Sequence, residues 1–126
     1  MTDKKETGAQ GELIAIQFLV KRGYKLIARN YRKPWGEIDV IAEKDDIVHF
    51  VEVKTVLQSG DFSREMGYRP EELAHSTKLK KVARTASLYM EERKDTRDFQ
   101  VDVVGVIMNP ATRIARCRLF EQALGE

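Results

Sequence analysis

The sequence predicts an α/β fold in which a mixed β-sheet is flanked by helices. Three observations favour this class. Apolar residues recur at helical spacing in two segments, one near the N-terminus and one in the second half of the chain. Several short segments between and after them are rich in β-branched residues or alternate charged with apolar side chains. The resulting order of helix, three strands, helix, strand, strand is typical of helices packed on a mixed sheet.

The first half of the chain is expected to contain one helix followed by three strands. The apolar residues of the helix end at Gly23, which fits the position after a helix C-terminus. Pro34-Trp35-Gly36 marks a turn, and Lys44-Asp45-Asp46 is short enough to connect an antiparallel hairpin. The expected bounds are 9–22 for the helix and 24–31, 37–43 and 48–55 for the strands.

The second half is expected to contain a loop, a long helix and two strands. Residues 58–70 have little periodicity, so we expect a long mobile loop, a feature that is often functional. Residues 71–93 are predicted to form the helix, and Asn109-Pro110 ends the strand that follows it. The buried stripe of the helix is expected to be Leu79, Val82, Ala83, Ala86 and Met90. The last strands are expected at 99–108 and 114–120.

Composition limits the class of protein. The length of 126 residues suggests a single domain over 1–126, and 42% hydrophobic with 33% charged residues argues against disorder. The apolar runs are shorter than the roughly 20 residues that cross a bilayer. The polar N-terminus lacks the apolar segment of a secretion signal, and Cys117 is alone, so we expect a cytoplasmic protein without disulfides. A net charge of +2 does not by itself indicate nucleic-acid binding.

The predicted hairpin contains carboxylates inside apolar strands. In the segment Glu37-Ile38-Asp39-Val40-Ile41, a period of two places Glu37 and Asp39 on one face and Ile38 and Val40 on the other. Aspartate is depleted in strands, so Asp39 among apolar neighbours indicates a function. The alternative is an ordinary amphipathic strand with no site.

The next strand contains Phe50-Val51-Glu52-Val53-Lys54, in which Glu52 and Lys54 share one face. Paired strands lie about 4.8 Å apart, so Asp39 and Glu52 can meet across the hairpin. Two adjacent carboxylates repel each other, and a hard divalent cation such as Mg²⁺ removes that cost. Lys54 would then lie beside the cation, where it could orient or deprotonate a water or stabilise charge on a phosphate.

These motifs resemble those of the YraN family of small bacterial proteins. The matching residues are Gly36-Glu37-Ile38-Asp39-Val40-Ile41 and Phe50-Val51-Glu52-Val53-Lys54-Thr55, together with Gly11-Glu12, Arg29-Asn30-Tyr31 and Asp102-Val103-Val104. The similarity covers nearly the whole chain. That family resembles the restriction-endonuclease-like, or PD-(D/E)xK, superfamily, and within it the archaeal Holliday-junction resolvases. The resemblance implies a restriction-endonuclease-like fold of order α-β-β-β-α-β-β.

The resemblance also implies the roles of individual residues. Asp39 corresponds to the metal-binding aspartate, and Glu52 and Lys54 correspond to the (D/E)xK pair. The carbonyl of Val53 would complete the metal shell, and Glu12 matches a first-helix glutamate that reaches the metal directly or through water. The implied catalytic residues are therefore Asp39, Glu52, Lys54 and Glu12. The implied metal ligands are Asp39, Glu52, Val53 and Glu12, for Mg²⁺ with Mn²⁺ as the alternative.

DNA contacts are expected from basic residues, namely Arg29, Arg32, Lys78, Lys81 and Arg84. The alternative is a solvated helix face. Trp35 is expected either to stack on a base or sugar or to cover the edge of the core. Relative to the family pattern, Val56 and Gln100-Val101 replace an arginine and an Arg-Phe pair, which concerns DNA contacts more than metal. His49 is expected to be structural or exposed, and Asp102 is expected to make structural hydrogen bonds.

The sequence thus predicts a metal-dependent endonuclease that hydrolyses DNA phosphodiester bonds, with branched or structured DNA as a candidate substrate. The resemblance to resolvases implies a homodimer, since two-fold symmetry lets two strands be cut. Two alternatives stay open: a nucleic-acid-binding module of the same fold without hydrolysis, and an adaptor that binds a protein through the 58–70 loop. The presence of Asp39, Glu52 and Lys54 together favours the nuclease.

Overall fold

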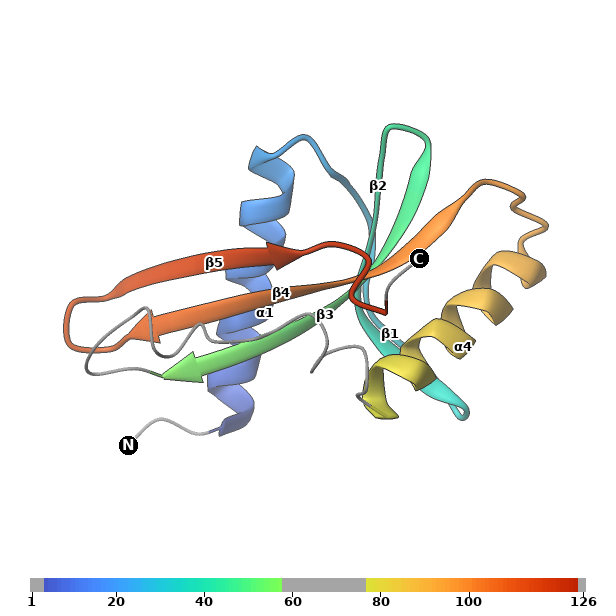
Figure 1. The fold of residues 1–126 in the computed structure, drawn as a ribbon. Helices are drawn as coiled ribbons and strands as arrows, with labels where there is room; N and C mark the ends of the chain where they lie inside the picture. Colours follow the sequence, from blue (N-terminus) through green and yellow to red (C-terminus); the bar gives the residue numbers. More distant parts are fainter. Residues whose placement is uncertain (1–3, 58–76, 125–126) are drawn as a thin grey trace.

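The computed structural model describes residues 4–57 and 77–124 and confirms the predicted order of elements (Figure 1). The helices are α1 (Lys4–Lys21) and α4 (Thr77–Glu92). The strands are β1 (Lys25–Lys33), β2 (Gly36–Lys44), β3 (Ile47–Leu57), β4 (Phe99–Asn109) and β5 (Ile114–Phe120). The loop predicted at 58–70 and the predicted helical residues 71–76 lie outside the described residues.

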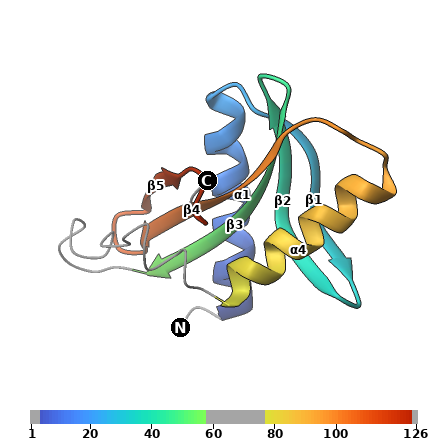
Figure 2. The same ribbon diagram turned by 45° about the vertical axis from the view of Figure 1, so that its right-hand side comes forward.

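The five strands form one mixed sheet in the spatial order β1-β2-β3-β4-β5. The pair β3 and β4 is parallel, and the other neighbouring strands are antiparallel. Figures 1 and 2 show α1 on one face of the sheet and α4 on the other. The predicted α/β class with helices flanking a mixed sheet is therefore confirmed.

Local sequence explains where α1 ends and where the β2–β3 hairpin turns. Tyr24 N donates to Leu19 O at 3.1 Å and Gly23 N donates to Val20 O at 3.0 Å, which is a Schellman cap. Gly23 has a φ of 93°, as the left-handed position of that cap requires. In the β2–β3 hairpin, Asp45 and Asp46 have φ values of 53° and 65°, which fits the two-residue type I′ turn that matches strand twist.

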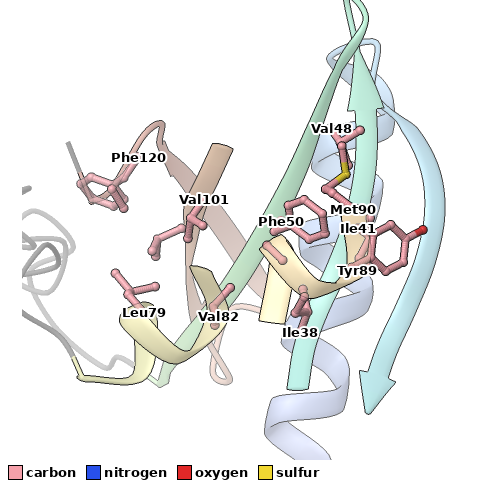
Figure 3. Close-up of a cluster of buried hydrophobic side chains, with 13 residues drawn as sticks. Ile38, Ile41, Val48, Phe50, Leu79, Val82, Tyr89, Met90, Val101 and Phe120 are labelled. Carbon is pink, nitrogen blue, oxygen red and sulfur yellow. The ribbon is translucent and has the colours of Figure 1, made fainter. Parts of the chain in front are cut away.

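Two hydrophobic clusters cover the two faces of the sheet. The cluster under α4, drawn in Figure 3, joins strand residues such as Phe50 and Val103 to Val82 and Tyr89 of the helix. The cluster under α1 joins Val40, Val51 and Val104 to the helix. The buried positions of α1 are Thr7, Gly11, Ala15 and Leu19, whereas Leu13 and Val20 are 46% and 52% exposed. Small residues thus let α1 lie close to the sheet, whereas Leu13 and Val20 face solvent.

The prediction that Ile38 and Val40 share a face is wrong. Ile38 lies in the α4 cluster with Ile41, and Val40 lies in the α1 cluster. The cause is a local break in the pleat, because Asn30 on β1 has a φ of 52° between the pairs Arg29↔Val40 and Tyr31↔Ile38. A left-handed residue interrupts the regular alternation of side chains along a strand. On β1 and β2, the side chains on the two sides of this level therefore no longer follow a single period of two.

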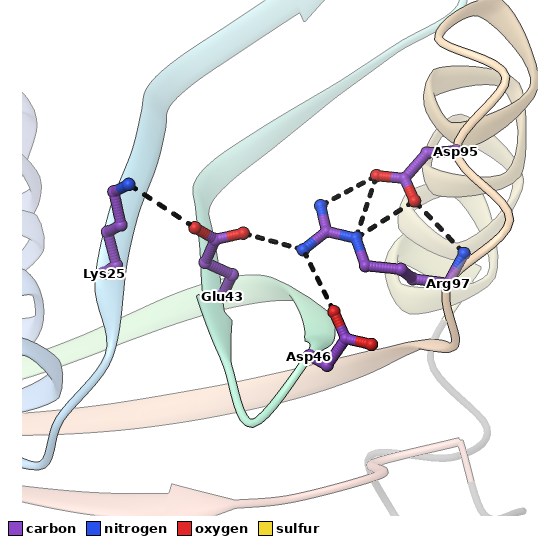
Figure 4. A network of polar contacts seen from close by, with 5 residues as sticks. All are labelled: Lys25, Glu43, Asp46, Asp95 and Arg97. Atoms are coloured by element: carbon purple, nitrogen blue, oxygen red, sulfur yellow. Dashed lines mark hydrogen bonds and ion pairs between the residues drawn. The ribbon is translucent and has the colours of Figure 1, made fainter.

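Arg97 connects the segment before β4 to the β2–β3 hairpin (Figure 4). Its guanidinium donates to Glu43 at 2.8 Å and to Asp95 at 2.8 Å, and Lys25 pairs with Glu43 at 3.7 Å. The pKa values of Glu43 and Asp95 are lowered, first by their hydrogen bonds to Arg97. This network fixes the end of the sheet away from Asp39. Among the described helices, neither is long and apolar enough to cross a bilayer.

Candidate metal centre

Asp39 lies where β2 and β3 separate. The backbone ladder between these strands extends from Lys44↔Ile47 to Val40↔Val51. Beyond it, Oδ2 of Asp39 accepts a hydrogen bond from the Val53 amide at 2.8 Å. The carboxylate therefore lies between the two strands, at the level of the break in the pleat at Asn30.

Glu52 lies beside Asp39 and is almost fully buried, with 2% of its surface exposed. Its Oε2 atom accepts a hydrogen bond from Lys78 Nζ on α4 at 2.8 Å. Burial first, and then the contact with Asp39, raise the pKa of Glu52 to about 7, while Lys78 acts to lower it. A second carboxylate buried beside Asp39 is thus costly to ionise, which is the electrostatic situation that a bound cation relieves.

Glu12 approaches the pair from the opposite side, on α1. Its pKa is raised, first by burial and then by the negative charge of Asp39, while Arg29 and Arg32 lower it. Glu12, Asp39 and Glu52 do not form a compact triplet, however. In residues 4–57 and 77–124, the group of three metal-ligating side chains whose ligand atoms all lie within 4.8 Å of one another is a different one.

Two glycines let the helices reach this part of the sheet. A Cβ atom at Gly11 of α1 would overlap the side chain of Thr55 on β3. A Cβ atom at Gly36 of β2 would overlap Thr85 on α4, whose hydroxyl donates to Lys81 O at 2.9 Å. Each glycine belongs to one of the sequence motifs, Gly11-Glu12 or Gly36-Glu37-Ile38-Asp39, so the motifs encode close packing as well as charge.

Hollows lie on both sides of the carboxylate pair. On the α1 side, a hollow of about 520 Å³ is lined by Thr7, Glu12, Val53 and Thr55, among others. On the α4 side, a groove of about 390 Å³ lies against Trp35 and is also lined by the cationic residues Lys33, Lys78 and Lys81. The first hollow reaches Glu12, and the second reaches Lys78, the ion-pair partner of Glu52.

The predicted DNA-contacting residues divide between the two sides. Arg29 and Arg32 act electrostatically on Glu12, and Arg32 also pairs with Glu37 at 3.2 Å. Lys78 and Lys81 line the α4 groove, and Arg84 is exposed further along that helix. Lys54 is half-buried, two residues beyond Glu52 on β3.

Sequence reasoning did not predict the ion pair between Lys78 and Glu52, nor the pairing of His49 with Asp102. The sequence predicts a phosphate contact for Lys78, because its position in a basic helix gives no sign of a carboxylate partner. His49 Nδ1 and Asp102 Oδ2 lie 2.6 Å apart, and both residues are buried. Their presence as polar residues inside apolar strands was the available signal, but their contact depends on the register of β3 and β4.

Comparison with known proteins identifies relatives over most of the chain. The model of the uncharacterised protein family UPF0102 matches residues 11–106. A UPF0102 protein of Campylobacter hominis is 38% identical over 79% of this chain and 81% of its own length. One of Dictyoglomus thermophilum is 35% identical over 89% and 91%, and one of Caldicellulosiruptor saccharolyticus is 35% identical over 96% and 98%. The chain therefore belongs to the UPF0102 family, which is the YraN family that its motifs resemble.

Proposed function

We propose that this protein is a metal-dependent endonuclease that hydrolyses DNA phosphodiester bonds, with branched or structured DNA as the candidate substrate. The observation that supports this most directly is the contact of Asp39 with the buried Glu52 where β2 and β3 separate. Lys54 follows on the same strand, and Glu12 approaches from α1. A purely structural hairpin has no evident need for two carboxylates at one buried point.

The site fits a hard divalent cation. Asp39 and Glu52 offer carboxylate oxygens, and the carbonyl of Val53 is the expected third ligand, so every donor is an oxygen. An all-oxygen set suits Mg²⁺ or Mn²⁺ better than a softer metal. The raised pKa of Glu52 supports the fit, because a cation would stabilise its ionised form.

The chemistry divides between the ion and the side chains around it. A bound Mg²⁺ would polarise the scissile phosphate and lower the pKa of a water. Asp39 and Glu52 would hold the ion, and Lys54 would orient the attacking water or stabilise negative charge on the phosphate. Since Glu12 does not form a compact triplet with them, we assign it to a water on the α1 side.

Substrate binding would use both sides of the sheet. A DNA strand crossing the site would meet Lys78 and Lys81 on the α4 side and Arg29 and Arg32 on the other. Trp35 lines the α4 groove and is 42% exposed, so its ring could stack on a base. Cutting two strands of a branched substrate would require a homodimer, which we propose as the active form.

One observation favours a second candidate function, a nucleic-acid-binding module that does not hydrolyse. Lys78 already neutralises Glu52 through an ion pair, so the buried carboxylate can be balanced without a metal. The third possibility, a protein-binding adaptor, depends on the 58–70 loop, which lies outside the described residues.

A cleavage assay separates these possibilities. Wild-type protein would be incubated with duplex, single-stranded and four-way-junction DNA in Mg²⁺, Mn²⁺ or a chelator. We expect metal-dependent cleavage of the junction, lowered at least about 100-fold by Asp39→Asn and unchanged by Asp98→Asn, a matched change at an exposed aspartate. DNA binding without cleavage of any substrate would support the binding module, and absence of both would reject the two nucleic-acid functions.

A further inference from the structure

A second group of ligating side chains lies on the α1 face of the sheet, away from the Glu52 side of β3. His49 of β3 and Asp102 of β4 are 4% and 0% exposed, and they share the strand faces of Val51 and Val104 in the α1 cluster. Glu121 follows β5 and is exposed. The ligand atoms of His49, Asp102 and Glu121 all lie within 4.8 Å of one another.

We propose that His49, Asp102 and Glu121 form a second metal site, which binds Zn²⁺ or a transition-metal ion of similar preference. The donor set is one imidazole nitrogen and two carboxylate oxygens, which are ligands that Zn²⁺ accepts. An imidazole ligand also distinguishes this group from the all-oxygen donors at Asp39 and Glu52. The proposal is independent of the nuclease function, because it uses none of the same residues.

Hydrogen bonds around the group orient its ligands. Asp102 Oδ1 accepts from the side chain of Gln100 at 2.9 Å and from the Gln122 amide at 2.9 Å, so Oδ2 is turned to His49. The same Gln100 amide nitrogen donates to Glu121 Oε1 at 3.3 Å. Outer hydrogen bonds of this kind fix ligating carboxylates in metal sites.

Binding requires only small movements. In a tetrahedral zinc site the ligand atoms are about 3.3 Å apart, given metal–ligand bonds of about 2.0 to 2.2 Å. The distance between His49 Nδ1 and Asp102 Oδ2, which is 2.6 Å, would lengthen slightly. The exposed carboxylate of Glu121 would move toward these two atoms. Nδ1 would bind the ion without a proton, as part of a neutral ring protonated on Nε2. The proton between Nδ1 and Asp102 would leave to solvent, and a ring that started neutral with its proton on Nδ1 would take up another proton at Nε2. A water in the adjacent polar hollow of about 250 Å³ would supply the fourth ligand.

The two carboxylates of the ligand group favour a cation. The pKa of the adjacent Tyr24 is raised to about 12, first by the burial of its hydroxyl and then by the negative charges of Asp102 and Glu121. Tyr24 makes an edge contact with His49 at 4.9 Å between ring centroids. The hollow is lined by other charged residues as well, namely Arg22, Lys44 and Asp45. The two cations lie over aromatic rings, Arg22 over Phe18 at 4.4 Å and Lys44 over Tyr24 at 5.0 Å.

The ion would fasten the turn after β5 to the middle of the sheet. That turn already folds back, since Gln122 N donates to Asp102 and Ala123 N donates to Val101 O at 2.9 Å. Glu121 would add a metal bond between this turn and the strands β3 and β4. The site would thereby stabilise β5, which forms one edge of the sheet.

The test is calorimetric titration of chelator-treated full-length protein with Zn²⁺, together with thermal unfolding. We expect one Zn²⁺ per chain at this site and a rise in Tm of about 10 °C when free zinc is 100 times the Kd. Glu121→Gln should weaken binding at least about 10-fold. His49→Phe should abolish it. Asp45→Asn, a matched change in the same hollow, should leave the affinity within about 3-fold.

Further variants exclude the other possible zinc ligands. Binding should persist in Cys117→Ser and in Asp39→Ala, which remove the thiol and the carboxylate of the first site. Zinc binding that is absent in wild type, that survives Glu121→Gln undiminished, or that disappears with Asp39→Ala overturns the proposal. If His49→Phe does not fold, the comparison of Glu121→Gln with Asp45→Asn decides. Cleavage activity is not used in this test, so its outcome leaves the nuclease proposal unaffected.

Discussion

The Nζ atom of Lys78 lies 2.8 Å from the Oε2 atom of Glu52, and this ion pair joins the first turn of α4 to β3. The Lys78 side chain is 58% exposed, whereas that of Glu52 is 2% exposed. Lys78 can therefore move away into solvent, whereas Glu52 stays buried. A divalent cation at Glu52 would compete with the ammonium, and a displaced Lys78 would be available to a phosphate in the adjacent groove.

Lys78→Met should strengthen divalent-metal binding. Removing the ammonium deletes a positive charge next to Glu52, so we expect the Kd for Mg²⁺ to fall by about 3- to 10-fold. The measurement is calorimetric titration at pH 8.5, where Glu52 is ionised. Lys80→Met, at an exposed lysine of the same helix, is the matched control and should not change the Kd. Weaker Mg²⁺ binding by Lys78→Met would show that the ammonium supports the ion instead of competing with it.

The stability of the metal-free protein should depend on pH through Glu52. The pKa of Glu52 is about 7 in the folded protein, against an ordinary value of 4.5. Between these pH values the folded state keeps a proton that the unfolded chain releases, so the contribution of this group to stability falls as the pH rises. Glu52→Gln imitates the protonated form. Its free energy of unfolding, relative to wild type, should be about 2 to 3 kcal/mol higher at pH 8 than at pH 4.5.

Urea unfolding of both proteins at several pH values checks this prediction. Saturating Mg²⁺ should reduce the difference at pH 8, because the ion stabilises wild type and not Glu52→Gln. A difference in free energy of unfolding that is constant from pH 4.5 to 8 would contradict the assignment of the titration to Glu52.

Asn30 should be replaceable by glycine but not by alanine. Its φ of 52° is tolerated by asparagine and glycine, and other residues lose about 1 to 2 kcal/mol there. Asn30→Ala should therefore lower the free energy of unfolding by that amount, and Asn30→Gly should leave it nearly unchanged. Because the break in the pleat lies level with Asp39, we expect Asn30→Ala also to weaken Mg²⁺ binding. Equal stability of the two variants in denaturant unfolding would contradict the strain argument.

Trp35 provides an intrinsic probe of DNA binding, since it is the single tryptophan of the chain. It lines the groove with Lys78 and Lys81, so DNA in that groove should change its fluorescence. Binding should weaken with salt, and Lys81→Met should lower the slope of log K against log salt by about 1. Lys80→Met should retain the wild-type slope. A salt-independent affinity would exclude phosphate contacts as the basis of binding.

Much of the fold is predictable because its signals are local. Gly23 as a helix cap and the Asp45-Asp46 turn follow from residue type and neighbours, and both have the expected conformations. The approach of Asp39 to Glu52 also follows locally, because one short hairpin places them opposite each other. The exchange of faces at Asp39 was not predictable, since a period of two assumes regular backbone and Asn30 breaks it.

Contacts between segments that are distant in the sequence could not be predicted either. The pair Lys78 and Glu52 requires the position of α4 on the sheet. The pair His49 and Asp102 requires the parallel register of β3 and β4, whose connection spans residues 58–98. Such registers depend on the total packing of the core and not on any one segment.

The two glycines at which the helices approach the sheet have a consequence for variation in this family. Gly11 and Gly36 determine how closely the helices approach the sheet near the candidate metal centre, since a methyl group at either position would meet a threonine on the opposing element. In a library of single substitutions, we therefore expect Gly11 and Gly36 to accept as few other residues as Asp39 and Glu52 do. The absence of a side chain at these two positions thus determines how closely each helix packs on the sheet. A design that seeks more space there would first replace Thr55 and Thr85 with smaller residues.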